Sequence, residues 1–293
     1  MKKRVLIIGS SGMLGRDLAH ELRSGYEVCG ADIAGSGKSI KKFYSCDITK
    51  KKNVADVIMK ARPDIVILTA AWTDVDGCER DPKKAYRVNA DGAWHVALTC
   101  KTAGLPLIFI STDFVFNGRK RSLYRETDRT SPLSVYGDSK LQGEHAVRTA
   151  LKEHIIVRTS WLYGVHGKNF VDTIVAKGKI EPRLRVVDDQ VGSPTSTIDL
   201  SRALRKLTDL LTEDPEYGTF HVSNAGKVSW YGYAREILRL AGLKTRVEPI
   251  SSRELDRPAK RPALSELDCS KLKKMTGMRM RPWKAALSEY IQN

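Results

Sequence analysis

The sequence predicts an α/β protein built on a doubly wound parallel sheet, and two patterns indicate this class. Short apolar runs that suit buried strands alternate with longer amphipathic stretches as far as about residue 160. The first run, residues 4–8, is followed by glycines at positions 9, 12 and 15 and then by a helical pattern. Such a turn presents backbone N–H groups and the positive end of a helix dipole, which together suit a pyrophosphate.

Six strands of a Rossmann-type sheet are expected in the first part of the chain, at residues 4–8, 27–31, 41–45, 64–69, 105–110 and 154–158. The helices between them include one at about 13–23, one long helix capped by Asp81 and Pro82, and one from Tyr136 to about residue 151. Parallel strands joined by helices need right-handed crossovers, and ligands of such sheets bind outside the carboxyl ends of the strands.

The chain is expected to divide into two unequal parts. Residues 1–160 form a dinucleotide-binding domain, to which segments near 188–223 return because residues 218–222 have the pattern of another strand. Residues 161–187 and 224–293 form a small mixed C-terminal lobe that binds substrate. The polar segment 117–132 is either a lid on the substrate side or an ordinary surface loop.

The composition is that of an ordinary globular protein with an excess of positive charge. The net charge of +16 indicates either nucleic-acid binding or attraction of anionic small molecules such as nucleotide diphosphates, and the spread of basic residues without a nucleic-acid-binding motif favours the second. Five scattered cysteines without a C-x-x-C pair argue against a disulfide framework or a zinc site. We expect a cytoplasmic protein, a monomer or homodimer, with no nucleic-acid or membrane partner and no metal.

Three residues form a candidate catalytic set. Tyr136 and Lys140 are four residues apart, which puts them on one face of a helix. A lysine ammonium near the phenol would lower the tyrosine pKa from its usual value of about 10 towards neutrality. Thr112 follows an apolar strand, and its hydroxyl could hold the oxygen of a carbonyl substrate while Tyr136 donates a proton. This set supplies the acid half of a carbonyl reduction, and the hydride half requires a nicotinamide cofactor.

Candidate cofactor residues follow the carboxyl ends of the predicted strands. Asp32 ends the second strand, where a carboxylate can hydrogen-bond the hydroxyls of an adenosine ribose. Asp47 and Ile48 would cover the adenine, and small residues after the fourth strand would admit the ribose and nicotinamide. The full set is Gly9, Ser11, Gly12, Met13, Leu14, Asp32, Asp47, Ile48, Ala70, Ala71, Trp72, Thr73, Tyr136 and Lys140. The expected cofactor is NADPH or NADH.

Other polar and aromatic side chains are candidates for the substrate side. Trp161 could stack on a sugar and Arg261 could pair with a phosphate, although a core tryptophan and a solvated arginine suit the spacing equally well. Asn169, just before a predicted helix, is a further candidate. Asn89, within the long predicted helix, is expected to be a structural hydrogen-bonding residue.

Taken together, these landmarks resemble the extended short-chain dehydrogenases and, more narrowly, the dTDP-4-dehydrorhamnose reductase family. The likeness covers nearly the whole chain. Its most specific pieces are Ser-Thr-Asp-Phe-Val-Phe at 111–116, Ser-Pro-Leu-Ser-Val-Tyr-Gly-Asp-Ser-Lys at 131–140, Arg-Thr-Ser-Trp-Leu-Tyr at 158–163, Asp-Gln-Val-Gly-Ser-Pro-Thr at 189–195 and Arg-Pro at 261–262. The resemblance implies reduction by NAD(P)H of the C4 keto group of a nucleotide-activated deoxysugar, giving dTDP-L-rhamnose from dTDP-4-dehydro-L-rhamnose.

The resemblance also implies residue roles. Tyr136 would donate the proton, Lys140 would lower its pKa and hold the nicotinamide ribose, Thr112 and Asp113 would contact the sugar, and Trp161 would line the sugar pocket. Gly12, Met13 and Leu14 would hold the pyrophosphate, Asp32 the adenosine ribose, and Asp47 and Ile48 the adenine, while Ala71, Trp72 and Thr73 would flank the nicotinamide half.

Three features bear on how far the resemblance extends. The family often has a small residue or an imidazole where Trp72 stands, so the pocket near the nicotinamide is expected to differ. Asp32 would repel a 2′-phosphate and so favours NADH, whereas Lys38 would offset this for NADPH, and the sequence leaves both cofactors open. Some family members dimerise around magnesium, but Arg16 or Asp17 occupies the corresponding position here, so no metal is expected.

Two other functions stay open at this point. One is a nucleotide-sugar 4-epimerase, which keeps its NAD bound and returns the hydride. The other is a non-catalytic NADP-binding regulatory subunit, like that of methionine adenosyltransferase, a relative of the same family. The intact set of Thr112, Tyr136 and Lys140 argues against a regulatory role, because such a role does not use a tuned phenol.

Overall fold

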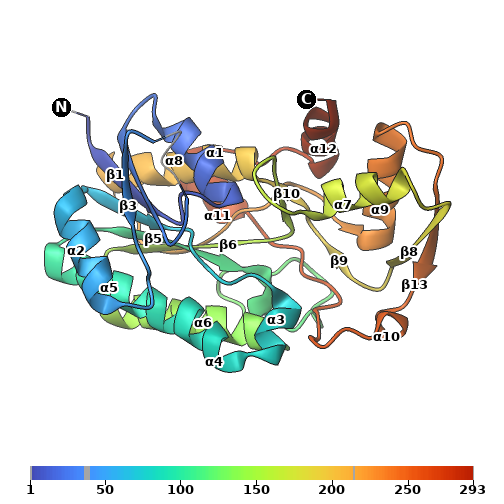
Figure 1. Cartoon of the computed structure of the whole chain (residues 1–293), viewed down its shortest axis with the longest axis horizontal. Coiled ribbons are helices and arrows are strands. Elements are labelled where there is room, and N and C mark those ends of the chain that lie inside the picture. Colours follow the sequence, from blue (N-terminus) through green and yellow to red (C-terminus); the bar gives the residue numbers. More distant parts are fainter. Residues whose placement is uncertain (1, 36–39, 214, 293) are drawn as a thin grey trace.

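A seven-stranded parallel sheet forms the centre of the larger part of the molecule (Figure 1). The computed structural model describes residues 2–35, 40–213 and 215–292. The strands are β1 (Arg4–Ile8), β2 (Glu27–Asp32), β3 (Lys42–Ser45), β4 (Ile65–Leu68), β5 (Leu107–Thr112), β6 (His154–Thr159) and β11 (Gly218–His221). Their order in the sheet is β11-β6-β5-β4-β1-β2-β3. β1 and β4 stay paired up to Ile8 and Leu68, but the helices that follow them, α1 (Met13–Leu22) and α5 (Gly92–Ala103), lie on opposite faces of the sheet, which leaves room for a ligand between the two connections.

Helices cover both faces of this sheet (Figure 1). On one face lie α1 (Met13–Leu22), α8 (Thr197–Glu213) and α11 (Ser270–Thr276), and on the other lie α2 (Lys51–Ala61), α5 (Gly92–Ala103) and α6 (Val135–Ala150). Apolar side chains of the strands point alternately to the two faces, so each face has its own buried core. Leu6 and Ile8 belong to one core and Val5 and Ile7 to the other, which shows this alternation within β1.

Short helices and turns connect the sheet to the site. They are α3 (Val75–Arg80), α4 (Pro82–Tyr86), the π-helix η1 (Arg87–Asp91) and the 3₁₀ turn η2 (Asp113–Val115). Asp81 caps α4 by accepting a hydrogen bond from the Lys84 backbone N–H, at 3.0 Å, as the sequence predicts.

The C-terminal half of the chain adds a smaller mixed region with its own core. It contains α7 (Phe170–Gly178), α9 (Trp230–Leu240), α10 (Ser252–Leu255), α12 (Trp283–Gln292) and the short strands β7 (Leu162–Tyr163), β8 (Arg183–Val187), β9 (Val191–Gly192), β10 (Thr195–Ser196), β12 (Val228–Ser229) and β13 (Arg246–Ile250). β8 and β13 pair in parallel, and β12 pairs with β9 in the antiparallel sense. Tyr163, Tyr233 and Trp283 are the largest side chains of this core.

The predicted fold class is confirmed, and the six predicted strands agree with the observed ones to within two residues. β11, from the segment expected to return, completes the sheet beside β6. The single long helix predicted after Asp81 is wrong in detail, because the π-helix η1 interrupts it between α4 and α5. No helix in the described ranges is both long and apolar enough to cross a bilayer.

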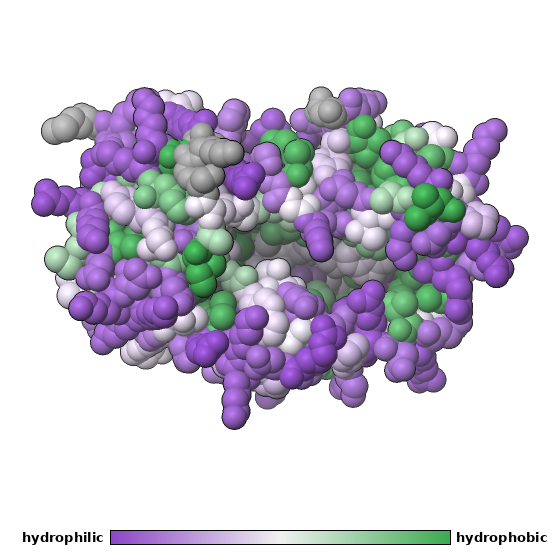
Figure 2. All heavy atoms as spheres, viewed as in Figure 1, coloured by the Kyte–Doolittle hydropathy of each residue, from purple (hydrophilic) through white to green (hydrophobic). Residues whose placement is uncertain are grey.

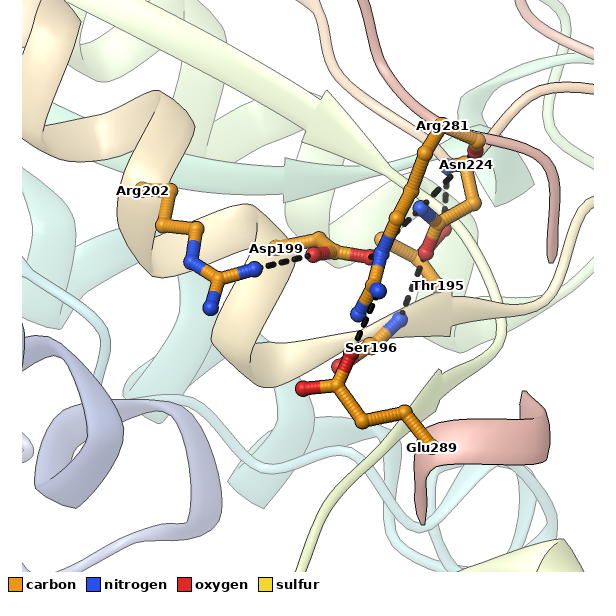
Figure 3. Close-up of polar contacts among 7 residues, drawn as sticks. All are labelled: Thr195, Ser196, Asp199, Arg202, Asn224, Arg281 and Glu289. Carbon is orange, nitrogen blue, oxygen red and sulfur yellow. Dashed lines mark hydrogen bonds and ion pairs between the residues drawn. The ribbon is translucent and has the colours of Figure 1, made fainter. Parts of the chain in front are cut away.

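A buried polar cluster links the segment around Arg281 and α12 to α8, which covers one face of the sheet (Figure 3). Asp199, in the first turn of α8, accepts hydrogen bonds from the Arg281 Nε and the Asn224 Nδ2, each at 2.8 Å, and from Arg202 at 3.2 Å. Arg281 also pairs with Glu289 of α12. Because the Asp199 side chain is only 4% exposed, its charge depends on these partners rather than on water.

Asp199→Asn is expected to destabilise the fold by about 2 to 3 kcal/mol, since it leaves the Arg281 guanidinium without its buried counter-charge. Urea unfolding of the variant and the wild type measures this difference. A midpoint equal to that of the wild type would show that the cluster does not hold the C-terminal segment.

Candidate active site

A cleft of about 460 Å³ lies at the carboxyl edge of the sheet. Its lining comes from the segments that follow four neighbouring strands: Gly9 after β1, Thr69 after β4, Asp113 after β5 and Ser160 after β6. The face drawn in Figure 2 is hollowed near its middle, between the sheet and the C-terminal region. The cleft therefore has the location that the strand order predicts for a ligand.

The glycine turn after β1 is shaped for close approach of a ligand's phosphates. Gly9 has a φ of +99°, and a Cβ there would lie 2.4 Å from the Ala70 backbone nitrogen. A Cβ on Gly15 would lie 2.2 Å from the Gly9 carbonyl oxygen, so only glycine lets α1 begin this close to the strand. No side chain of residues 2–35, 40–213 or 215–292 caps α1, so N–H groups of its first turn are available to an anion.

The three predicted catalytic residues come together on the cleft wall. Thr112 ends β5, and Tyr136 and Lys140 occupy successive turns of α6. α6 packs closely on η2 because Gly137 has no side chain; a Cβ there would lie 2.3 Å from the Phe114 carbonyl oxygen. The Tyr136 ring meets the Phe114 ring edge-on at 5.5 Å.

Burial controls the protonation of both α6 residues. The pKa of Tyr136 is raised above its usual value by burial, against a smaller opposing effect of the Thr112 hydroxyl. Burial also lowers the pKa of Lys140 to about 7, although Glu144 one turn later opposes this. The prediction that Lys140 lowers the Tyr136 pKa is wrong, because desolvation raises this pKa and the Thr112 hydroxyl, not Lys140, is the group that opposes the rise.

Lys140 is held by groups other than the phenol. Its Nζ donates a hydrogen bond to the Ile110 carbonyl oxygen at 2.7 Å and lies 4.2 Å from the centre of the Phe109 ring. Behind it, Glu144 is paired with Arg158, with an N–O distance of 2.7 Å. The lysine head is thus fixed against the sheet at the floor of the cleft.

Asn89 joins the segment after β4, which is predicted to flank the nicotinamide, to α6. Its side chain accepts a hydrogen bond from the Trp72 N–H at 2.8 Å and donates to the Trp72 carbonyl and the Ser139 hydroxyl, at 3.1 and 3.0 Å. Asn89 lies in the π-helix η1, a distortion that is common near functional sites. It is a structural hydrogen-bonding residue, as expected, and it fixes the backbone of the predicted cofactor segment.

Two buried polar side chains on the wall suit a polar ligand. Burial raises the pKa of Asp113 to about 7, against the opposing Ser265 and Thr112 hydroxyls. Asp113 can therefore donate as well as accept a hydrogen bond near neutrality. The Thr159 hydroxyl oxygen is buried and has no hydrogen-bond partner among the described residues, so a sugar hydroxyl could satisfy it.

Most of the residues predicted from the sequence line the cleft. They are Gly9, Gly12, Met13, Leu14, Ala71, Thr73, Thr112, Asp113, Tyr136, Lys140, Trp161 and Arg261. Six predicted cofactor residues are not part of this lining: Ser11, Asp32, Asp47, Ile48, Ala70 and Trp72. Segment 117–132 contributes nothing to the lining, so the lid interpretation is not supported, and Lys38 lies outside the described residues.

Residues outside the lining have identifiable structural partners. Asp32 accepts a hydrogen bond from the Ser11 N–H at 3.0 Å, which holds the glycine turn against β2. Asp47 accepts from both the backbone and the hydroxyl of Thr49, and Ile48 is buried in the core beneath the sheet. The Lys84 ammonium lies over the Trp72 ring, 4.3 Å from the ring centre.

Asn169 does not line the cleft. It caps α7 by accepting a hydrogen bond from the Asp172 N–H at 3.0 Å, and its amide donates to the Gly164 carbonyl and the Tyr290 hydroxyl. The structure therefore gives Asn169 a capping role instead of the expected place in the substrate site. Its position just before a helix is typical of a cap.

A second cavity of about 350 Å³ adjoins the cleft. Four residues line both: Phe114, Trp161, Trp230 and Arg261. Trp161 has a φ of +47°, in the left-handed region that a bulky residue rarely adopts, and its ring stacks on Trp230 at 3.5 Å. Gly192 allows this arrangement, because a Cβ there would lie 2.6 Å from the Trp161 ring.

Sequence reasoning missed Lys168 and Trp230. Lys168 lines the cleft beside the glycine turn, and a Cβ on its neighbour Gly167 would lie 3.3 Å from Met13. It is exposed and makes no hydrogen bond or ion pair within the described part of the chain. A basic residue that follows a glycine-containing turn after β7 is a weak signal, because only the fold brings it back to Met13.

The fold and the cleft define a class: an extended short-chain dehydrogenase/reductase. Residues 2–293 match the family model described as the RmlD substrate binding domain. The chain is 40% identical over 290 residues to the spore coat polysaccharide biosynthesis protein SpsK of Bacillus subtilis, covering 99% of this chain and 97% of that protein. It is also 40% identical over 291 residues to the dTDP-4-dehydrorhamnose reductase of Streptomyces griseus, covering 98% and 93% respectively.

A solved structure gives the same result. The dTDP-4-dehydrorhamnose reductase of Bacillus anthracis in complex with NADP superposes with a TM-score of 0.92 at 37% identity, covering 100% of this chain and 99% of that one. This chain belongs to the dTDP-4-dehydrorhamnose reductase family.

Lys140→Met is expected to stabilise the fold by about 3 kcal/mol near pH 6, because the wild type must bury a protonated amine there. As pH rises from about 7 to 10.5, the native lysine is neutral while the unfolded one is still charged, so the wild type gains stability and the advantage of the variant fades. Chemical unfolding across this range measures the effect. Lys177→Met on the exposed face of α7 is the control, and an advantage independent of pH would contradict the burial argument.

Lys168→Met is expected to weaken NADPH binding by about tenfold, because it removes a cation from the cofactor phosphates. Equilibrium titration followed by cofactor fluorescence measures the dissociation constant without any sugar. Lys179→Met, an exposed lysine that lines neither cavity, is the control. The affinity of the wild type for NADPH should also fall more steeply with salt concentration than that of the variant. If the wild type and Lys168→Met bound NADPH equally well, Lys168 would not belong to the cofactor site.

Proposed function

We propose that this chain uses NADPH or NADH to reduce the C4 keto group of a nucleotide-activated deoxysugar, converting dTDP-4-dehydro-L-rhamnose to dTDP-L-rhamnose. The observation that carries the proposal is the joining of a glycine turn suited to phosphates with Thr112, Tyr136 and Lys140 in one cleft. Membership of the reductase family and similarity to a relative with NADP bound support it.

The chemistry that a bound dihydronicotinamide supplies is a hydride for the C4 carbon of the sugar. Tyr136 donates its phenolic proton to the C4 oxygen, and its raised pKa keeps this proton in place until the oxygen gains negative charge. The Thr112 hydroxyl, on the same wall, holds the oxygen in line with the phenol. Burial of this wall excludes water from the reacting atoms.

For the cofactor, we assign Gly9, Ser11, Gly12, Met13 and Leu14 to the pyrophosphate, Asp32 to the adenosine ribose, and Asp47 and Ile48 to the adenine. Ala70, Ala71, Trp72 and Thr73 would flank the nicotinamide half, and Lys140 would bind its ribose. Support comes from the free N–H groups at the start of α1 and from the fixed Trp72 backbone. A bound cofactor would raise the fraction of charged Lys140, because its phosphates and hydroxyls restore polar surroundings.

For the substrate, we assign the sugar to Thr112, Asp113 and Trp161 in the cleft and the nucleotide to the adjoining cavity, with Arg261 between them. Residues 1–160 and the returning segments near 188–223 would then form the dinucleotide-binding domain, and residues 161–187 and 224–293 the substrate-binding lobe, from which Lys168 would also reach the cofactor phosphates. Every residue in this scheme comes from one chain, so it holds for a monomer or a homodimer alike. The five free thiols support a cytoplasmic setting.

Tyr136→Phe is expected to lower kcat by about a thousandfold while changing NADPH affinity by less than about twofold, because only the transferred proton is lost. The assay follows consumption of NADPH or NADH that depends on dTDP-4-dehydro-L-rhamnose. Tyr217→Phe, an exposed tyrosine away from both cavities, is the control.

The two alternatives give different results in this assay. A 4-epimerase would interconvert sugars with tightly held NAD and no net cofactor consumption, and a regulatory subunit would bind NADP without any turnover. If the Tyr136→Phe variant kept its activity, the protein would still be a reductase, but Tyr136 would not be the residue that donates the proton.

A further inference from the structure

A buried carboxylate outside the catalytic set reaches across to the C-terminal region. Asp76, on α3, accepts a hydrogen bond from the Arg257 guanidinium at 2.9 Å and from the Arg261 guanidinium at 3.0 Å, both on Oδ2. Its Oδ1 accepts from the Ala259 N–H at 3.3 Å. The Asp76 side chain is 10% exposed, so its charge is compensated mainly by these two arginines.

The loop that these contacts hold has few other attachments. Residues 258–262 make no backbone-to-backbone hydrogen bond within the described part of the chain, and regular pairing resumes only where the Val191 N–H donates to the Ala263 carbonyl at 2.8 Å. Within the loop, Arg261 donates to the Ala259 carbonyl at 2.9 Å. The Asp76 carboxylate therefore sets the position of the loop and the direction of both guanidinium groups.

Arg261 lies where the two cavities meet, and Arg257 lies beside it in the side cavity. Both line the side cavity, and Arg261 also lines the cleft, with Trp161 and Trp230 on the same boundary. Two cations against one carboxylate leave a net positive charge at this boundary. Arg261 is largely buried, with a side chain 17% exposed, so its direction depends on its partners rather than on solvent. A diphosphate that links a sugar in the cleft to a base in the side cavity would pass this point.

We propose that Asp76 is a positioning residue for the substrate's diphosphate: it holds Arg261 at the boundary between the two cavities and Arg257 beside it in the side cavity, with their remaining N–H groups available to phosphate oxygens. This inference rests on the proposed nucleotide-sugar substrate. Asp76 does not touch substrate, and it acts through the two arginines. The low pKa of Asp76, brought to about 2 by the arginines against the effect of burial, keeps the carboxylate charged at every working pH.

The test is binding of dTDP and of thymidine to the full-length protein by calorimetry, with steady-state kinetics beside it. Asp76→Asn keeps the size of the side chain and an acceptor for the Ala259 N–H but removes the charge. It is expected to weaken dTDP binding by about tenfold and thymidine binding by less than about twofold, because only the phosphates use the arginines. The KM for the nucleotide sugar should rise similarly, with kcat and NADPH affinity nearly unchanged.

A double-mutant cycle tests whether Asp76 acts through Arg261. In an Arg261→Met background, Asp76→Asn should weaken dTDP binding by less than about threefold, because only Arg257, the more exposed of the two arginines that it positions, is left. Asp76→Glu, which restores a carboxylate, should recover part of the lost dTDP affinity. This conservative variant also keeps the test usable if Asp76→Asn folds poorly.

Asp199→Asn is the matched control. Asp199 is likewise buried, holds two arginines and fastens a C-terminal segment, yet neither it nor Arg281 lines either cavity (Figure 3). It should lower stability without changing dTDP affinity.

Unchanged or tighter dTDP binding in Asp76→Asn would overturn the role of Asp76 but not the proposed substrate, as would equal losses of affinity for dTDP and for thymidine. A wild-type protein that binds no dTDP would overturn the proposed substrate as well.

Discussion

The carboxyl edge of the parallel sheet is the constraint on which the rest of the structure depends. Parallel strands have their carboxyl ends at the same edge of the sheet, so the segments that follow β1, β4, β5 and β6 lie close together there. The glycine turn, the Trp72 segment, Thr112 and the start of the Trp161 segment are far apart in sequence and adjacent in space for this reason. α6 packs on the segment after β5 at Gly137, and this close contact brings Tyr136 to the same edge.

Burial of ionisable groups is the second physical theme of the site. Lys140 and Asp113 both have pKa values near 7, which free lysine and aspartate do not, and both shifts come mainly from desolvation. Such groups destabilise a fold, and their presence on the wall of a cleft is typical of a functional site. By contrast, Glu144 is buried with Arg158 as an ion pair, and its pKa stays low because the guanidinium outweighs the effect of burial.

The parts of the molecule that sequence reasoning predicted well are those set by local pattern. Apolar runs located the strands, the glycines located the turn, and the four-residue spacing put Tyr136 and Lys140 on one helix face. What it missed depends on tertiary contact. Asn89, in the π-helix η1, hydrogen-bonds to Trp72 and Ser139, which are distant in sequence. The pKa of Tyr136 is raised by burial rather than lowered by Lys140. Asp76 pairs with Arg261, a residue to which no local pattern relates it.

Reduction by this protein requires that the reduced cofactor and the C4 carbon of the sugar meet in one continuous cleft for direct hydride transfer. The most direct measurement uses NADPH deuterated at C4 of the nicotinamide, on each of its two faces in turn, followed by mass spectrometry and NMR of the sugar product. Direct hydride transfer gives one deuterium at C4 of the product from one of the two labelled cofactors and none from the other. Product formed with hydrogen from solvent at C4 in both cases would contradict it.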